Sequence, residues 1–399
     1  MSHPTKSYLI SMDKRLRQLS IIKNRFETCN RCFNERKKNS SYCEPVPSSV
    51  GIKLTNRCNL RCKHCFEWSE TGYHHNMKRQ DMFGDVPLSM ILDLLTFTKS
   101  TKAPIYLWGG EPTIYKRWDE LCSLICEFDR DVVICTNGVN ITKLSDSLCR
   151  LGERVTLLFS IEGFLEQHDA IRGKGMYLQT IEALHVFSRL KSIGKYKGFL
   201  SVETVVSDPL IPHLVAYCDS YKDTLIDSLY LNFPWFINPT AASSMDIFFE
   251  ETFKDICCGQ TVLKKNYSWH SFDFRISSVL IHNLKKALKE INEQEYPFMI
   301  HYNPSLEEKD LVDYLNGEDI LKTSSQMCLS YSQRIDILPN GDICPCKKYP
   351  ELTVGNLNNQ SIENLWNGGN FERFRRAINN RLMPICSKCE LFYAYNKSK

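Results

Sequence analysis

Short apolar, β-rich runs recur along the chain from residue 50 to residue 233, and helical patterns separate them. The helical patterns include residues 87–100 and 176–193. Six alternations of strand and helix with short connections predict a parallel α/β sheet, either curved into a barrel or doubly wound. The six strands that we expect are 50–55, 103–108, 131–136, 154–161, 198–206 and 228–233.

The segments that flank this alternation have different patterns. One helix is expected around residues 9–25, before a loop with cysteines, and another covers 277–292 in a stretch without a series of strands. Near the C-terminus, Asn340-Gly341 lies between β-prone runs and favours a tight hairpin, and a last helix is expected from about 361 to 380. We divide the chain into an N-terminal extension, an α/β domain, a helical insert and a C-terminal module, at residues 1–50, 51–235, 236–326 and 327–399.

The bulk composition bounds the class of protein. The chain has 399 residues, of which 43% are apolar, so a sizeable core can be buried. The net charge of +4 argues neither for nor against a nucleic-acid surface, and no other nucleic-acid signal is present. The N-terminal residues are too charged for a secretory signal, and no run of about 18 apolar residues predicts a membrane span. We expect a cytoplasmic protein with neither a nucleic-acid nor a membrane partner.

Cysteine is unusually frequent, with 18 residues in the chain. In a reducing compartment, clustered cysteines are better explained by metal or redox chemistry than by disulfides. Eleven cysteines fall into three groups, and the other seven stand in apolar or mixed surroundings. We expect buried structural thiols at those seven positions, Cys122, Cys126, Cys135, Cys149, Cys218, Cys257 and Cys258.

The densest group has the spacing C-x3-C-x2-C and directly follows the first expected strand. Its members are Cys58, Cys62 and Cys65. A structural zinc site needs four closed ligands, and His64 lies inside the C-x2-C turn, where its ring is hard to aim at the same metal. An iron–sulfur cubane normally takes four thiolates, so three would leave one iron open to a small molecule with an amine and a carboxylate.

On these residues the chain resembles the radical S-adenosylmethionine (SAM) enzymes. Their motif is C-x3-C-x2-C with a following aromatic residue, here Phe66, in the loop after the first strand of a partial (β/α)6 barrel. The resemblance implies a [4Fe–4S] cluster on Cys58, Cys62 and Cys65 with SAM on the open iron. It also implies reductive cleavage of SAM to a 5′-deoxyadenosyl radical, which removes a hydrogen from the substrate.

Further motifs follow at successive strand ends in the order of that family. They read LWGGEP at 107–112, CTNG at 135–138, FSIEG at 159–163 and HDAIRGKGMY at 168–177. In the family these segments meet the amino group, the ribose and the carboxylate of SAM, although aspartate is commoner where Glu162 stands. The resemblance implies that SAM contacts Phe66, Gly109, Gly110, Glu111, Asn137, Ser160, Glu162 and Arg172.

The C-terminal cysteines resemble a SPASM module, in which a cysteine, a spacer, a glycine and four residues precede the next cysteine. Here Gly341 is that glycine, and the module closes with CSKC. The resemblance implies an auxiliary [4Fe–4S] cluster, with a zinc ribbon as the alternative. The module is truncated, because no cysteine follows the CSKC motif. The expected ligands are Cys328, Cys346, Cys386 and Cys389.

Four clustered cysteines remain, and we group them as a hypothesis. Cys29, Cys32 and Cys43 have the spacing C-x2-C-x10-C, and Cys344 is the extra cysteine of the C-terminal module. Three and one make the four thiolates of a further cluster or of a zinc site. The alternatives are a zinc site completed by another ligand and thiols without a metal.

The resemblance also bears on the substrate. SPASM enzymes mostly act on peptides, so we expect a maturase that installs a thioether or a carbon–carbon (cyclophane) crosslink in a ribosomally made precursor peptide. A flavodoxin- or ferredoxin-type electron donor is implied. The 50 residues before the barrel are too few for a recognition domain, which weakens the peptide interpretation without removing it, because many maturases lack this domain or receive it from a separate peptide-recognition protein. The alternatives are a dehydrogenase or epimerase of a sugar or aminocyclitol, and an anaerobic sulfatase-type maturase. No catalytic acid or base can be named, although Glu203, Tyr230 and Asn232 lie on late strands.

Overall fold

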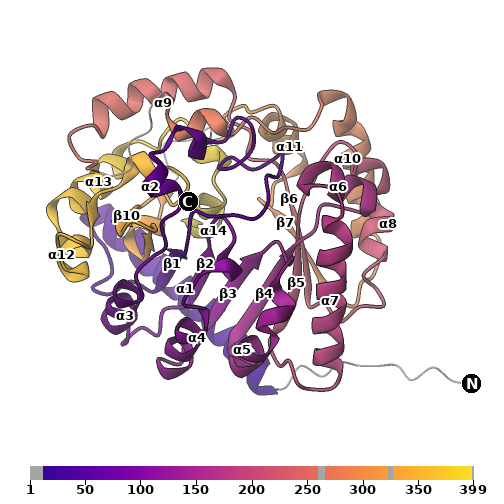
Figure 1. Cartoon of the computed structure of the whole chain (residues 1–399). Coiled ribbons are helices and arrows are strands. Elements are labelled where there is room, and N and C mark those ends of the chain that lie inside the picture. Colours follow the sequence, from indigo (N-terminus) through magenta and orange to yellow (C-terminus); the bar gives the residue numbers. More distant parts are fainter. Residues whose placement is uncertain (1–11, 259–265, 322–326, 398–399) are drawn as a thin grey trace, which may run out of the picture.

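The computed structural model describes residues 12–258, 266–321 and 327–397 (Figure 1). Its main sheet has ten strands in the order β11-β10-β9-β1-β2-β3-β4-β5-β6-β7. Strands β1 to β6 are parallel to their neighbours, which confirms the predicted parallel α/β sheet. All six expected strands are present, as β1 Ser49–Lys53, β2 Ile105–Trp108, β3 Val132–Thr136, β4 Val155–Ser160, β5 Phe199–Val205 and β6 Ser228–Asn232.

The two faces of the sheet differ in chemistry because successive side chains of a strand point to opposite sides. Val50, Ile134 and Val202 lie on the face that packs under helices and belong to the main core. The opposite face carries polar side chains such as Lys53 and Glu203. Helices on one face only indicate a partial barrel rather than a doubly wound sheet. The helices of the outer face (Figure 1) are α3 Leu88–Phe97, α4 Trp118–Glu127, α5 Ser145–Arg150, α7 Met176–Ser192, α8 Leu214–Asp219 and α10 Ile281–Asn292.

The C-terminal module joins the same sheet, which the sequence did not reveal. Strand β9 (Arg334–Ile337) pairs parallel with β1. Strand β10 (Asp342–Ile343) pairs antiparallel with β9 on one side and with β11 (Gly355–Asn356) on the other. The expected hairpin at Asn340-Gly341 is confirmed. Gly51 makes the junction with β9, since a Cβ there would lie 1.7 Å from Asp336 Oδ1.

Residues 266–321 contain a strand that we did not expect. β7 (Met299–Asn303) pairs with β6 and ends the sheet. Its sequence, MIHYN, has no continuous apolar run, and its side chains are half-buried or exposed. Helix α11 (Glu308–Leu315) lies in the same region as α10, and α9 (Pro239–Thr252) precedes them in the chain.

The N-terminal helix is longer than expected. α1 spans Met12–Lys38, so Cys29 and Cys32 lie on a helix and not in a loop, while residues 9–11 of the expected helix lie outside the described residues. Arg36 anchors α1 to the C-terminal module, because its Nη1 donates to the carbonyl oxygen of Cys328 at 2.6 Å. The expected last helix is two helices, α12 Ile362–Asn367 and α13 Gly369–Asn380, which meet at Gly368.

The shorter elements complete the described fold. They are α2 Arg79–Met82, α6 Leu165–Arg172, α14 Glu390–Tyr395, and the two-stranded sheet of β8 Met327–Cys328 and β12 Asn396–Lys397. Within the described ranges, no helix combines the length and the apolar character that crossing a membrane requires.

Candidate active site

The loop after β1 brings the three clustered cysteines together. Cys62 is buried, and Cys58 and Cys65 are half-buried. Burial raises the pKa of Cys58 and of Cys65, the latter to about 12, and the nearby Cys62 thiol adds to both shifts. The thiols of this loop are therefore close enough to interact. Because burial disfavours their charged form, thiolates at these positions need a nearby positive charge. A set of thiol donors without a fourth fits an iron–sulfur cluster with one open iron.

Two glycines after β2 let a second loop contact the cysteine loop. The backbone nitrogens of Gly110 and Glu111 donate to the carbonyl oxygens of Thr55 and Arg57, at 2.9 Å and 2.8 Å. A Cβ on Gly109 would lie 2.5 Å from Thr55 O, and one on Gly110 would lie 2.1 Å from Arg57 O. These glycines therefore hold the cysteine loop through backbone contact.

Replacing Gly110 with alanine is expected to displace the cysteine loop. The added methyl group meets backbone atoms, which cannot rotate away, so we expect a loss of about 1–3 kcal/mol in the free energy of unfolding. Gly369→Ala is the control, because a Cβ there meets nothing within 4 Å. Urea unfolding and iron content measure both variants. Equal stability of the two variants would contradict this account of the loop.

Glu111 connects the ends of β2 and β3. Its Oε1 accepts from the backbone nitrogen and hydroxyl of Thr113 and from the Thr136 hydroxyl, and its Oε2 accepts from Asn137 N at 2.8 Å. Burial raises the pKa of Glu111, and these hydrogen bonds oppose the rise. Asn137 continues the network, since its Nδ2 donates to Asn59 Oδ1 in the cysteine loop at 2.8 Å. Glu111 and Asn137 thus fix the ends of two strands against that loop.

Glu162 forms a buried ion network beside Cys62. Its carboxylate accepts from Arg172 Nη2 at 2.5 Å, from Val205 N at 2.7 Å, and pairs with His64 Nε2 at 2.9 Å. Burial by itself would raise the pKa of Glu162, but Arg172 and His64 outweigh it and hold that pKa at about 2. Arg172 Nη1 also lies 3.8 Å from Cys62 Sγ. This network accounts for His64, which lies inside the C-x2-C turn.

The polar inner face of the sheet, which we call the chamber, carries the carboxyl of Glu203 on β5. Its Oε1 accepts from Asn232 Nδ2 at 2.8 Å, and Asn232 Oδ1 accepts from Asn303 Nδ2 at 2.9 Å. Burial raises the pKa of Glu203, and the nearby Glu162 adds to the rise. Tyr230 stacks on His301 in the same row of the sheet. Glu203, Tyr230 and Asn232, which were noted on the late strands in the sequence, therefore all have their side chains on the inner face of the sheet.

Cys135 corrects one expectation about the scattered thiols. It is half-buried in the chamber, where its Sγ lies 3.6 Å from Glu203 Oε2 and 3.9 Å from the predicted SAM contact Ser160. Cys122 and Cys218 are buried as expected, whereas Cys258 is exposed. Nothing in the sequence indicates these differences except the place of Cys135 at a strand end. Cys126, Cys149 and Cys257 are half-buried.

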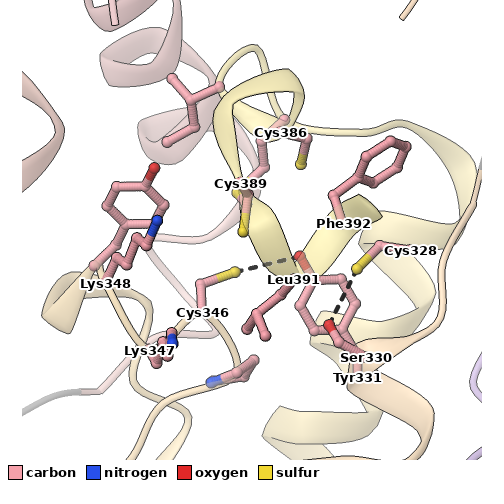
Figure 2. Close-up of a pocket in the computed structure, with 14 residues that line it drawn as sticks. Cys328, Ser330, Tyr331, Cys346, Lys347, Lys348, Cys386, Cys389, Leu391 and Phe392 are labelled. Carbon is pink, nitrogen blue, oxygen red and sulfur yellow. Dashed lines mark hydrogen bonds between the residues drawn. The ribbon is translucent and has the colours of Figure 1, made fainter. Parts of the chain in front are cut away.

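The four cysteines expected in the C-terminal module line one cavity. Figure 2 shows their side chains gathered around a common space, with Tyr331 and Phe392 among the residues that close it. The Tyr331 hydroxyl lies 3.2 Å from Cys346 Sγ, and Ser330 Oγ lies 3.0 Å from Cys328 Sγ. Four thiols on one aromatic-walled cavity fit the ligand set of a cubane. The four are Cys328, Cys346, Cys386 and Cys389.

The remaining clustered cysteines are not joined in this way. Cys344 Sγ donates to the carbonyl oxygens of Cys346 and Tyr349, whereas Cys29 contacts Gln333. Cys32 Sγ donates to Glu44 Oε1, and Cys43 packs against the main core. Within the three described ranges, no three His, Cys, Asp or Glu side chains lie as close together as the ligands of a single metal ion, and this holds for all three groups of cysteines. The four-cysteine site therefore stays a prediction.

Phe66 connects the cysteine loop to the rest of the molecule. Its ring stacks on Phe272 at 4.4 Å between centroids and meets Trp235 edge-on at 6.0 Å. The Lys348 ammonium stands 3.1 Å from the centroid of the Trp235 ring. Lys348 also lines the C-terminal cavity, so Trp235 and Lys348 connect Phe66 to that cavity.

These features define a class of protein that the comparisons confirm. Residues 52–200 match the Radical SAM superfamily, and residues 328–390 match the iron–sulfur cluster-binding domain SPASM. The chain therefore belongs to the radical SAM superfamily of enzymes. Within it, the chain is a member with a C-terminal SPASM domain, and the two domains imply [4Fe–4S] clusters and SAM as cofactors.

Individual relatives share most of this chain at low identity. The antilisterial bacteriocin subtilosin biosynthesis protein AlbA of Bacillus subtilis is 23% identical over 86% of this chain and 65% of its own length. The tungsten-containing aldehyde ferredoxin oxidoreductase cofactor-modifying protein of Pyrococcus furiosus is 22% identical, over 85% and 86%. The structure of Streptococcus suis SuiB bound to its precursor peptide SuiA has a TM-score of 0.54 at 15% identity, over 84% and 68%. This last likeness shows a shared fold.

Proposed function

We propose that this protein is a peptide maturase that removes a hydrogen from a precursor peptide and installs a thioether or carbon–carbon crosslink. In this proposal Cys58, Cys62 and Cys65 hold the first cluster, and the CTNG, FSIEG and HDAIRGKGMY segments surround SAM. When bound, the cluster and SAM supply the radical chemistry that an unactivated C–H bond requires. The auxiliary cluster is held by the four cysteines of the C-terminal cavity.

The observation that carries the proposal is a chain of contacts between the two cysteine sites. Phe66, which follows Cys65, contacts Trp235, and Trp235 contacts Lys348, which lines the C-terminal cavity. A crosslink removes two electrons from the peptide, so a second acceptor near the chamber is useful. The names of AlbA and SuiB, which concern a bacteriocin and a precursor peptide, support a peptide substrate.

The residues of the chamber supply the remaining functions. Asn232 holds the Glu203 carboxyl in place, and the raised pKa of Glu203 suits it to take the proton that leaves the peptide on oxidation. The Glu162–Arg172 pair orients the loop around Cys62, and the buried position of that pair keeps water away from it. We assign Glu203 as the substrate-side base on this geometry.

The partners and the location follow the same proposal. A flavodoxin- or ferredoxin-type protein supplies the electron, and a separate peptide-recognition protein presents the precursor. The reaction takes place in the cytoplasm, where free thiols stay reduced and can hold clusters.

A second candidate function is the oxidation or epimerisation of a small molecule. The relative from Pyrococcus furiosus is named as a cofactor-modifying protein. The polar side chains of the chamber, including Glu203, Asn232 and Asn303, suit the hydroxyl groups of a sugar or an aminocyclitol. A sulfatase-type maturase is a third candidate.

The test of the proposed function uses anaerobically reconstituted protein with SAM and dithionite. We expect release of 5′-deoxyadenosine. We also expect that a short peptide encoded beside the gene loses the mass of two hydrogens when it is produced together with this protein. Release of 5′-deoxyadenosine without a change in any such peptide, together with consumption of an added sugar or aminocyclitol, would favour the second candidate.

A further inference from the structure

Three charged side chains lie between the chamber and the C-terminal cavity. Lys347 Nζ lies 3.1 Å from Glu390 Oε1, and Lys348 forms an ion pair with the other oxygen of Glu390. Their side chains are 10%, 4% and 15% exposed, in the order Lys347, Lys348 and Glu390. Lys347 directly follows Cys346, and Glu390 directly follows Cys389, so the group is attached to two of the expected cluster ligands.

Aromatic rings also contact both ammonium groups. Lys348 Nζ lies 3.1 Å from the centroid of the Trp235 ring and 6.0 Å from that of Phe66, which follows Cys65. Lys347 Nζ lies 4.5 Å from the ring of Tyr106, on the inner face of the sheet. Such cation–π contacts stabilise a cation that has lost much of its water. The two lysines therefore stand between the chamber and the C-terminal cavity.

The group keeps a surplus charge. Two lysines face one glutamate, so with all three groups ionised one positive charge remains beside the four cysteines. Glu203 is near Lys347, and burial raises the pKa of Glu203, which favours its uncharged form. Another lysine of the module, Lys388, turns its Nζ onto the carbonyl oxygens of Tyr314 and Glu318. Burying ionised groups is a poor way to stabilise a fold, because desolvation offsets the attraction between them. A surplus cation at this place points to a role at the cluster.

We propose that Lys347, Lys348 and Glu390 set the reduction potential of the cluster held by Cys328, Cys346, Cys386 and Cys389. The inference rests on the proposed function only in that these cysteines hold an iron–sulfur cluster. Net charge near a cluster is one of the factors that set its potential. Reduction adds one electron, so a nearby positive charge favours the reduced form. The donor of that electron is the peptide radical left by hydrogen abstraction in the proposed reaction, and it is dithionite in the test below.

The test reads the auxiliary cluster alone. In a full-length background with Cys58, Cys62 and Cys65 replaced by alanine, an electron paramagnetic resonance titration against dithionite gives the midpoint potential. Lys348→Met removes the surplus positive charge and shifts the potential to a more negative value. Glu390→Gln adds to the surplus and shifts it to a more positive value. Lys286→Met, at an exposed lysine of α10, is the control and leaves the potential unchanged.

Opposite shifts in the two variants support the proposal, since a structural role would not give shifts of opposite sign. Unchanged potentials, or shifts in the same direction, overturn it. Loss of iron and sulfide from Lys347→Met, Lys348→Met and Glu390→Gln alike also overturns it, because the charges would then hold the fold. A background protein without any cluster overturns it as well. The result does not depend on SAM cleavage or on crosslinking, so a failure of the proposed peptide chemistry is seen separately.

Discussion

Replacement of Cys62 by alanine is expected to reduce SAM cleavage to the background of a reaction without protein. Cys62 is the buried member of the three-cysteine loop, and Arg172 contacts its sulfur. Without this thiolate the first cluster loses one of only three protein ligands, so it no longer presents a stable open iron. We expect the iron content to fall by about four per chain. The measurements are 5′-deoxyadenosine release with dithionite and iron per chain.

The control for this loss is Cys122→Ala. Cys122 is also buried, but it lies on α4 in the apolar core, away from the cysteine loop. Its thiol contributes packing alone, so the variant keeps both its iron and its SAM cleavage at a modest cost in stability. If Cys62→Ala released 5′-deoxyadenosine at the rate of Cys122→Ala, the three-cysteine loop could not be the site of the first cluster.

Most of the parallel sheet could be predicted because its signals are local. Val50, Ile134 and Val202 lie in short apolar runs that helices cover, and such runs identify buried strands from sequence. β7 has no such run because it lies at the edge of the sheet, where its side chains need not be apolar. Met299, for example, is 62% exposed. The pairing of β9 with β1 depends on Gly51 leaving room for Asp336, which is a contact across most of the chain. Sequence spacing carries no information about such a contact.

The candidate site likewise has a part that the sequence predicts and a part that only the fold reveals. The cysteine spacings are local, and the structure places Cys328, Cys346, Cys386 and Cys389 on one cavity. The partners of the other candidates come from distant segments. Glu162, which was expected to contact SAM, bonds to Val205 and His64, 43 and 98 residues away in the sequence.

The charges between the two cysteine sites could not be predicted at all. Lys347 and Lys348 look like ordinary surface lysines in the sequence, because nothing local marks Glu390 or Trp235 as their partners. Only the fold brings these segments together. The same holds for Cys135, whose contact with Glu203 joins β3 and β5 across β4.

The network of Glu162 and Arg172 gives the second large effect. Arg172→Met is expected to lower the free energy of unfolding by about 3–5 kcal/mol at neutral pH, because it leaves a buried carboxylate without its main partner. The pair has side-chain exposures of 9% for Arg172 and 1% for Glu162. Arg154→Met is the matched control. Its partner Asp129 is 38% exposed, so that pair contributes about 0–1 kcal/mol.

The pH dependence of this loss identifies its cause. The pKa of Glu162 is about 2 in the folded chain and 4.5 without these partners. A carboxyl whose pKa is lowered by folding stabilises the folded chain above pH 4.5, and this contribution disappears as the pH falls toward 2. The deficit of Arg172→Met should therefore be full at neutral pH and shrink through that range. Urea unfolding of the cluster-free protein measures it, and a deficit that stayed constant would mean that Arg172 stabilises the loop by packing and not by its charge.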